Sequence, residues 1–305
     1  MSYKLKEKMD HWRIGCIVED RILDLQGAYL KQVGDKGDSI IDADFPSDPD
    51  KFYSFGEEML EKARECLRHY QNEGESFEEI LYERESAILG APVPNPSKII
   101  CVGKNYAEHA AEMDSDVPDH PVLFAKFTNA LIGPEDSIEK SPATEKLDYE
   151  VELTIVIGKP ASKVKRAEAY DYIAGYTIGN DTSARDLQKR TQQWLQGKTL
   201  DRTTPIGPWV VTADELADPS NLYIRSFVNG EERQSSNTSK LIFDIPYLVE
   251  FISNLITLNP GDIIMTGTPD GVGFAMKPPQ FLNDGDVVTL EIEGIGTMEN
   301  KVVKP

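Results

Sequence analysis

The chain has 305 residues, of which 40% are hydrophobic and 28% are charged, a composition typical of a globular protein with a sizeable core. Its formal net charge is −20, from 32 basic and 52 acidic residues, so neither a nucleic acid nor an anionic membrane is expected as a partner. No apolar run approaches the roughly 20 residues of a membrane helix, and the N-terminus lacks a signal-peptide core, so we expect a cytoplasmic protein.

The first part of the chain is predicted to be a small α+β unit. Residues 13–25 have the pattern of a strand, an acidic turn and a second strand, and residues 57–70 have the spacing of a helix. Residues 90–98 contain three closely spaced prolines and are expected to be extended, without regular structure. We therefore predict a boundary between an N-terminal unit, residues 1–93, and a main domain, residues 94–305.

Short β-rich runs dominate the predicted main domain. The runs are residues 98–102, 151–157, 174–178, 209–212, 263–265 and 287–292. Asn229-Gly230 is a strong hairpin signal, and one helix is expected to begin at Asp244, followed by Pro246. Strands and helices do not alternate regularly, so the pattern favours an α+β, predominantly β fold over a doubly wound one.

The segment LDYEVEL, residues 147–153, carries acids at alternate positions. Asp148, Glu150 and Glu152 would share one face of a strand, opposite a row of apolar residues. Glu150 and Glu152 could hold Mg²⁺ or Mn²⁺, with Asp181 as a third ligand. The same pattern is also typical of a solvated strand face. Residue types alone leave both interpretations open.

The segment KNYAEHAAEM, residues 104–113, contains a histidine and a glutamate at helical spacing. His109 and Glu112 would be i, i+3 neighbours on one face of a helix. A carboxylate that orients an imidazole makes it a better general base. An incidental surface pair has the same pattern, and the HExxH zinc motif is absent.

Three cationic residues are candidates for contact with an anionic substrate. Arg185 could clamp a substrate carboxylate, or it could pair with Asp186 or another acid and fix its loop. Lys126 and Lys198 have apolar or small neighbours, which is unusual for surface lysines. Either lysine could stabilise an anionic intermediate or serve as an ordinary ion-pair partner.

The segment IIMTGTPDGVGF, residues 263–274, offers hydroxyl groups and exposed backbone amides after a strand-like run. It fits neither GxGxxG nor the Walker pattern, so nucleotide binding is not expected. GxSxG is also absent, which argues against an α/β-hydrolase serine.

Taken together and in this order, these stretches resemble the fumarylacetoacetate hydrolase family. The matching blocks are VGKNYAEHAAEM, PVLFAKF, LDYEVELTIVIG, GYTIGNDTSARDLQ, GKTLDRTTPIGPWV, GDIIMTGTPDGVG and the GDVVTLEIEGIG run. The resemblance covers about residues 94–303. It implies a rolled mixed β-sheet fold, usually assembled as a homodimer, with residues 1–93 as the variable N-terminal unit of longer relatives.

The resemblance also assigns expected roles to individual residues. The metal ligands would be Glu150, Glu152 and Asp181, holding Mg²⁺, Mn²⁺ or Ca²⁺. His109 and Glu112, on a short helix, would activate water or move protons, with Lys198 as a further catalytic group. Substrate would be oriented by Arg185, Gln188 and Thr268, and Lys126 is an added candidate for that role. Asp148 is expected to have a supporting role.

The expected substrate is a small anionic 2-oxo acid that reacts through an enolate. Hydrolysis of an acylpyruvate is the first expectation, with water activated by His109 and Glu112. Decarboxylation of oxaloacetate, in which the same site stabilises a pyruvate enolate, is the alternative. Isomerisation of a 2-hydroxy-dienoate and a metal-binding role without turnover also stay open.

Overall fold

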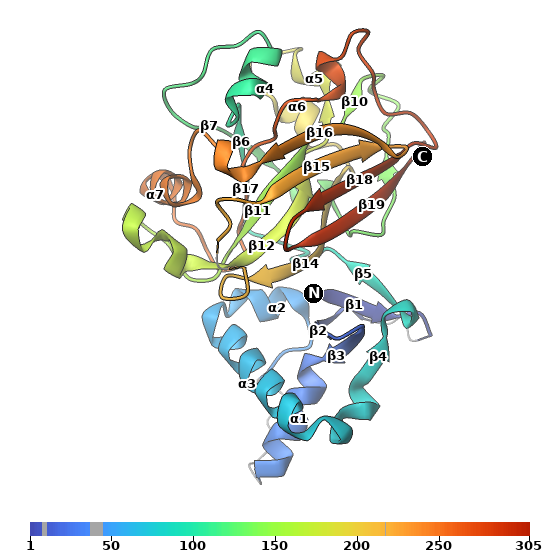
Figure 1. Cartoon of the computed structure of the whole chain (residues 1–305), viewed down its shortest axis with the longest axis vertical. Coiled ribbons are helices and arrows are strands. Elements are labelled where there is room, and N and C mark those ends of the chain that lie inside the picture. The colour runs from blue at the N-terminus through green and yellow to red at the C-terminus, as the bar shows by residue number, and fades with distance from the viewer. Residues whose placement is uncertain (8–10, 37–44, 217) are drawn as a thin grey trace.

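The structure is a computed structural model that describes residues 1–7, 11–36, 45–216 and 218–305. The chain forms a smaller lobe from its first ninety residues and a larger β-rich lobe from the remainder (Figure 1). Among the residues that the structure describes, no helix has both the length and the apolar composition needed to cross a membrane.

The smaller lobe is built on a five-stranded antiparallel sheet in the order β4-β3-β2-β1-β5. Its strands are β1 (Ser2–Leu5), β2 (Arg13–Val18), β3 (Arg21–Asp24), β4 (Leu81–Glu83) and β5 (Ala87–Gly90). Its α-helices are α1 (Leu25–Lys36), α2 (Pro49–Ser54) and α3 (Glu57–Glu73). The strand–turn–strand and the helix expected here are confirmed, whereas β1, β4, β5 and α1 were not predicted.

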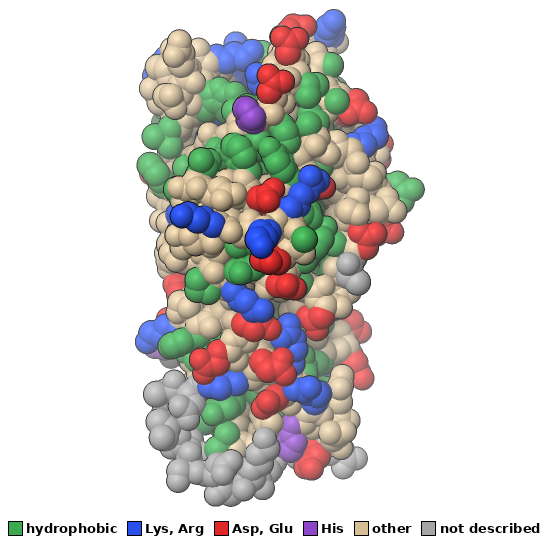
Figure 2. All heavy atoms as spheres, turned by 90° about the vertical axis from the view of Figure 1, so that its left-hand side faces the viewer, with side chains coloured by type: hydrophobic (Ala, Val, Ile, Leu, Met, Phe, Trp, Pro, Cys, Tyr) green, Lys and Arg blue, Asp and Glu red, His purple; other side chains and the backbone are tan. Residues whose placement is uncertain are grey.

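Helix α3 separates its apolar and charged side chains. Met59, Leu60, Ala63 and Cys66 are buried. The opposite face carries ion pairs such as Lys62–Glu58 and Arg68–Glu61, and Figure 2 shows mixed charges over this part of the molecule. Packing of the buried apolar face therefore stabilises the helix more than the ion pairs do, because exposed ion pairs of this kind contribute at most about 1 kcal/mol each.

The larger lobe contains a seven-stranded mixed sheet in the order β7-β6-β17-β11-β12-β14-β8. The strands are β6 (Ile99–Gly103), β7 (Val122–Lys126), β8 (Leu131–Ile132), β11 (Val151–Ile157), β12 (Ile173–Asn180), β14 (Thr204–Thr212) and β17 (Ile263–Met265). The pairs β17–β6 and β14–β8 are parallel, and the other neighbours are antiparallel.

A five-stranded sheet, in the order β16-β15-β18-β19-β9, packs against it. Its strands are β9 (Ile138–Glu139), β15 (Tyr223–Val228), β16 (Glu231–Asn237), β18 (Val287–Ile292) and β19 (Gly296–Val303). The short strands β10 (Leu147–Asp148) and β13 (Ser183–Ala184) form a separate pair. One apolar cluster joins Leu153 of β11 to Ile224 of β15 and Leu290 of β18, so the main core lies between the two large sheets.

Helices in the larger lobe are few. They are α4 (Ala107–Glu112), α5 (Arg185–Gln188), α6 (Leu195–Lys198) and α7 (Ile245–Leu255). Short 3₁₀ helices of this lobe occur at Thr128–Ala130, Arg166–Tyr172, Thr238–Lys240 and Gly273–Ala275, and the smaller lobe has two more, at Gly74–Ile80 and Arg84–Ser86. The helix predicted to begin at Asp244 is confirmed as α7, whose first turn is capped when the Asp244 carboxylate accepts from the backbone N–H of Tyr247.

The expected strands of the main domain are also confirmed. Asn229-Gly230 connects β15 to β16, with Val228 paired to Glu231. Residues 151–157, 263–265 and 287–292 match β11, β17 and β18, because each is a short β-branched run with a clear end. Residues 90–98 contain no helix and only the end of β5, as expected from their prolines. The division into an N-terminal unit and a main domain stays a prediction.

The LDYEVEL segment differs from the expectation in two ways. It is divided between β10 and β11, with Tyr149 and Glu150 outside either strand. None of its acids is solvated, since Asp148, Glu150 and Glu152 are 0%, 4% and 2% exposed. The interpretation of these acids as a wet strand face is therefore wrong. Both faces are covered because the segment lies inside the larger lobe.

The two lobes meet tightly at Gly56, the residue before α3. Gly56 has φ +59°, and a Cβ atom at this position would lie 2.2 Å from the carbonyl oxygen of Gly158. The N–H of Glu57 donates to that same carbonyl oxygen at 3.1 Å. Only glycine allows both this backbone conformation and this close approach.

We predict that Gly56→Ala lowers the free energy of unfolding by about 1–3 kcal/mol, the usual cost of such strain. The measurement is urea unfolding followed by circular dichroism. Gly34→Ala is the matched control, because a methyl group on Gly34 would lie in open space within α1. This control should be neutral or stabilising by up to about 1 kcal/mol. Equal stabilities for both variants would contradict the tight contact.

Candidate functional site

The three carboxylates predicted to bind a metal come together at one end of the β11–β12 pair. Glu152 lies in β11 opposite Gly179, and Asp181 follows directly after β12. The backbone N–H of Asp181 donates to the carbonyl oxygen of Glu150 at 2.9 Å, which brings the third acid alongside. One carboxylate oxygen from each residue lies within 4.8 Å of the others, and all three side chains are buried.

Two lysines and an arginine partly balance this negative charge. Lys198 Nζ lies 2.8 Å from Glu150 Oε2 and 2.7 Å from Asp181 Oδ2, and Lys126 Nζ lies 2.7 Å from Asp181 Oδ1. Burial opposes the charge on Lys198, yet Asp181 and Glu150 raise its pKa overall. Burial likewise opposes the charge on Glu150, but Lys198 and Arg185 lower its pKa. Lys198 and Glu150 are therefore both charged at neutral pH.

Glu152 is the exception, because it makes no ion pair with any described residue. Its Oε2 accepts a hydrogen bond from the Gly267 N–H at 2.8 Å. Burial, together with the charges of Asp181 and Glu150, raises the pKa of Glu152 well above its usual range. A divalent cation among these oxygens would supply the missing positive charge, and three buried carboxylates form a donor set that suits Mg²⁺ or Mn²⁺. The residues present therefore fit a hard divalent ion.

Arg185 uses its guanidinium group to hold the site together. Its Nε donates to Asp148 Oδ2 at 2.9 Å, its Nη1 donates to Gln188 Oε1 at 3.1 Å, and its Nη2 lies 2.7 Å from Glu150 Oε1. The sequence left open whether Arg185 clamps a substrate carboxylate or pairs with an acid of the protein. The structure shows that it pairs with Asp148 and Glu150, and not with Asp186. The Asp186 carboxylate instead accepts from the Thr144 hydroxyl.

Asp148 connects the carboxylate cluster to the glycine-rich loop, residues 266–273, and to Phe274 after it. Its two oxygens accept from the N–H groups of Gly273 and Phe274 at 2.8 and 3.0 Å, in addition to the Arg185 Nε. The side chain is fully buried. This arrangement agrees with the supporting role expected for Asp148.

The predicted His109–Glu112 pair is present on α4. His109 Nδ1 lies 2.7 Å from Glu112 Oε1, and Glu112 Oε2 accepts from the Gly271 N–H at 2.9 Å. Glu112 therefore holds the imidazole and ties α4 to the glycine-rich loop. In a neutral imidazole whose Nδ1–H donates to Glu112, the other ring nitrogen, Nε2, carries no proton and can accept one.

One small cavity contains the histidine and the metal-binding candidates together. Its volume is about 50 Å³. The predicted site residues that line it are His109, Glu150, Glu152, Asp181, Arg185, Gln188, Lys198 and Thr268. Lys126 and Glu112 do not line it and act on it through Asp181 and His109.

Sequence reasoning missed Gln234, which orients Thr268. Gln234 Nε2 donates to Thr268 Oγ1 at 2.7 Å and to the Pro269 carbonyl oxygen at 2.8 Å, and its Oε1 accepts from the Val151 N–H at 3.1 Å. A backbone N–H and a backbone carbonyl fix the amide orientation, so Thr268 Oγ1 accepts this bond. The Thr268 hydroxyl proton is then free to be donated into the cavity. Nothing in the surrounding ERQSSN segment signals this role.

Comparisons with known proteins agree with this geometry. Residues 98–303 match the family model described as fumarylacetoacetate (FAA) hydrolase C-terminal. The chain is 41% identical to oxaloacetate tautomerase YisK of Bacillus subtilis, over 99% of this chain and 100% of that protein. It is 45% identical to the mitochondrial oxaloacetate tautomerase Fahd2a of Rattus norvegicus, over 83% and 79% of the two chains.

A solved structure extends the comparison to the whole fold. Maleylpyruvate hydrolase from Sphingobium, in complex with manganese(II) and pyruvate, is 29% identical, with a TM-score of 0.75 over 100% of this chain and 99% of the other. The expected α+β, predominantly β fold with rolled mixed sheets is confirmed. Since the family model covers more than half of the chain and full-length relatives are over 40% identical, the chain belongs to the fumarylacetoacetate hydrolase family.

Proposed function

We propose that this protein is a divalent-metal-dependent enzyme that interconverts the keto and enol forms of oxaloacetate. The observation that carries the proposal is the single small cavity that contains both a buried three-carboxylate cluster and an oriented histidine. The names of two relatives, 41% identical over the full length and 45% identical over 79% of the other chain, support oxaloacetate as the substrate. Mg²⁺ or Mn²⁺ is the proposed ion, and the manganese in the maleylpyruvate hydrolase structure favours the latter.

A bound divalent ion would withdraw electrons from the 2-oxo group and so make the C3 protons more acidic. His109 Nε2 would accept one C3 proton while Nδ1–H stays bonded to Glu112. The electrons of the C3–H bond then form the C2–C3 double bond, and the 2-oxo oxygen becomes negatively charged. Transfer of the proton from His109 Nε2 to that oxygen gives the enol and returns the imidazole to its neutral form, and the reverse sequence gives the ketone.

The remaining polar groups would bind and orient the dianionic substrate. The Lys198 ammonium lies in the site, and its raised pKa keeps it positively charged next to the developing enolate oxygen. The Thr268 hydroxyl would donate to a substrate carboxylate, because Gln234 occupies its acceptor side. Arg185 and Gln188, which bond to each other, would shape the wall of the cavity. Lys126 would act indirectly, by holding Asp181.

Cleavage of a C–C bond is the second candidate, and it has a specific supporting observation. The imidazole held by Glu112 could activate water as well as accept a proton from carbon. The similar maleylpyruvate hydrolase structure contains pyruvate, the fragment that such a cleavage releases. The names of the relatives, oxaloacetate tautomerases, favour proton transfer over cleavage. Homodimer formation and a cytoplasmic location stay predictions.

An assay with two substrates and three readouts separates these functions. Enol consumption is followed with oxaloacetate, and pyruvate release is followed with oxaloacetate and with acetylpyruvate, after chelation and again after addition of Mn²⁺. We expect rapid Mn²⁺-dependent tautomerisation with little pyruvate. Faster release of pyruvate from acetylpyruvate would make hydrolysis the function, and faster release from oxaloacetate would indicate decarboxylation. No turnover would leave metal binding alone. Reactions with metal but no protein correct for spontaneous tautomerisation and decarboxylation.

We predict that Glu152→Gln removes the response of thermal stability to metal. Mn²⁺ should raise the Tm of the wild-type chain, since the ion binds the folded state, and should leave the Tm of the variant unchanged. Without metal, the variant should be at least as stable as the wild type, because a buried carboxylate without a cationic partner is removed. The measurement is calorimetric unfolding with and without Mn²⁺, and an equal Tm rise in both proteins would exclude Glu152 as a ligand.

Metal affinity of the wild-type chain should rise with pH. The raised pKa of Glu152 means that the metal-free site holds a proton there, which the ion must displace. Titration calorimetry at several pH values, in buffers with different ionisation enthalpies, would detect that proton. Affinity that is independent of pH would contradict this exchange.

We predict that His109→Gln lowers kcat for tautomerisation at least about 100-fold, the lower end of the usual contribution of a general base. Metal binding should persist, because His109 makes no contact with the three carboxylates in the described hydrogen bonds. Glu112→Gln should cause a smaller loss, about 10-fold, because its amide can still accept from Nδ1. If His109→Gln retains activity within about threefold, the histidine is not the base.

A further inference from the structure

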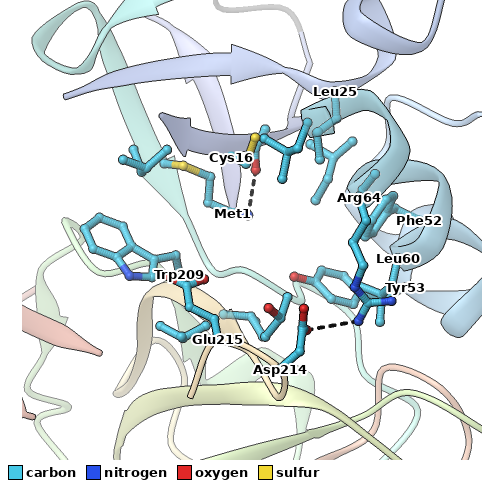
Figure 3. Close-up of a pocket in the computed structure, with 18 residues that line it drawn as sticks. Met1, Cys16, Leu25, Phe52, Tyr53, Leu60, Arg64, Trp209, Asp214 and Glu215 are labelled. Carbon is cyan, nitrogen blue, oxygen red and sulfur yellow. Dashed lines mark hydrogen bonds and ion pairs between the residues drawn. The ribbon is translucent and has the colours of Figure 1, made fainter. Parts of the chain in front are cut away.

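A second cavity, of about 300 Å³, lies between the two lobes (Figure 3). Strand β2 and helices α2 and α3 form its walls on one side, and β14 with the turn after it forms the other. It shares no lining residue with the small cavity that contains the carboxylate cluster. It is therefore a separate site, away from the proposed reaction.

Most of the wall is apolar. Phe52, Leu60, Ala63, Trp209 and Val211 are among the side chains that line it. Dry apolar cavities of about half this volume hold a benzene molecule, so one substituted aromatic ring would fit. Filling the space would recover dispersion contacts that the wall atoms now lack.

The Tyr53 hydroxyl is the polar group within this apolar surface. Figure 3 shows its oxygen directed into the open space, and it makes no hydrogen bond with a described residue. The residue is only 5% exposed. Burial raises the pKa of Tyr53, so the phenol stays neutral and can donate. A ligand with a hydrogen-bond acceptor would satisfy this donor.

Charges around the cavity exclude an anionic ligand. The Arg64 guanidinium lies 3.0 Å from Glu57, 3.2 Å from Glu61 and 3.1 Å from Asp214. Arg64 is therefore already neutralised by three carboxylates. The amino group of Met1 donates to the Gly15 carbonyl oxygen, and burial lowers its pKa to about 6. At neutral pH it provides little positive charge.

A cationic ligand is disfavoured for a related reason. The carboxylates that line the cavity, Asp214 and Glu215, belong to exposed residues at its rim, and Asp214 is already paired with Arg64. An ammonium group in the apolar interior would lose its hydration without gaining a buried counter-ion.

We propose that this cavity binds a small, uncharged, mainly apolar molecule, the size of one substituted aromatic ring, through a hydroxyl or carbonyl group that accepts from Tyr53. Since both lobes contribute walls, the ligand binds their packed arrangement and stabilises it. The proposal does not depend on the reaction assigned to the carboxylate cluster.

The test uses the full chain and four probes of similar shape: 2-phenylethanol, ethylbenzene, phenylacetate and 2-phenylethylamine. Binding is measured by titration calorimetry and by Tm shifts at pH 7.5. This pH lies on the order of one unit above the pKa of the Met1 amino group, about 6. We expect 2-phenylethanol to bind and to raise the Tm. The two charged probes should bind at least about tenfold more weakly, reflecting the cost of placing a charge in an apolar site. Absence of 2-phenylethanol binding, or tighter binding of phenylacetate, would overturn the proposal.

Two variants locate the site. Tyr53→Phe should weaken 2-phenylethanol about fivefold, the value of one hydrogen bond of about 1 kcal/mol, and leave ethylbenzene unchanged. Ala63→Phe should fill the cavity and abolish binding of both. An unchanged affinity for 2-phenylethanol in Tyr53→Phe would refute the hydroxyl contact, even if Ala63→Phe failed to fold. The Mn²⁺-induced Tm rise, retained in Tyr53→Phe, shows that the other site is intact.

Discussion

Burial of like charges is the constraint on which the site depends. Four buried carboxylates lie within the larger lobe: Glu150, Glu152 and Asp181 form one cluster, and Asp148 is joined to it through Arg185. Three cations pair with these acids, on Lys126, Lys198 and Arg185. Glu152 has no cationic partner among these residues, and its raised pKa means that burial and the neighbouring acids disfavour its charged form. Such an arrangement is costly unless a cation completes it. The fold therefore brings these carboxylates together, and a bound divalent ion would lower the cost of burying their charges.

Segments far apart in the chain meet at the glycine-rich loop, residues 266–273, and fix its position. Glu112 accepts from Gly271 and Asp148 accepts from Gly273. Gln234, from the second sheet, holds Thr268. Each bond uses a buried polar group of the loop, which would otherwise be left unsatisfied. A change in one of these three side chains would therefore disturb the loop, and with it the orientation of His109 or Thr268.

The sequence was sufficient to predict local elements and, through the family resemblance, the three residues of the carboxylate cluster. Strand β11 and the Asp244 cap are encoded by short, strong local signals. Gln234 could not be predicted, because its four hydrogen bonds join segments up to 83 residues apart. The burial of the acids in LDYEVEL could not be predicted either. The alternation of acidic and apolar residues shows which side chains share a strand face, but not what covers that face. Only the three-dimensional packing decides that.

The two faces of β11 are covered by different parts of the molecule, and the N-terminal lobe packs against one end of one face. Along β11, Val151, Leu153 and Ile155 enter the core between the two large sheets. On the opposite face, Val156 joins a cluster that includes Phe52 and Leu60 from α2 and α3, whereas Glu152 lies at the carboxylate cluster.

One strand face is therefore shared by two environments. At about 3.3 Å per residue, Val156 is roughly 13 Å along β11 from Glu152. Strand β6 has the same division, with Ile99 in the cluster that contacts the N-terminal lobe and Gly103 at the small cavity. The N-terminal lobe covers the apolar half of a sheet face whose other half carries the carboxylate cluster. Without that cover, the apolar half of this face, which includes Val156 and Ile99, would be exposed to water at a cost in hydrophobic free energy.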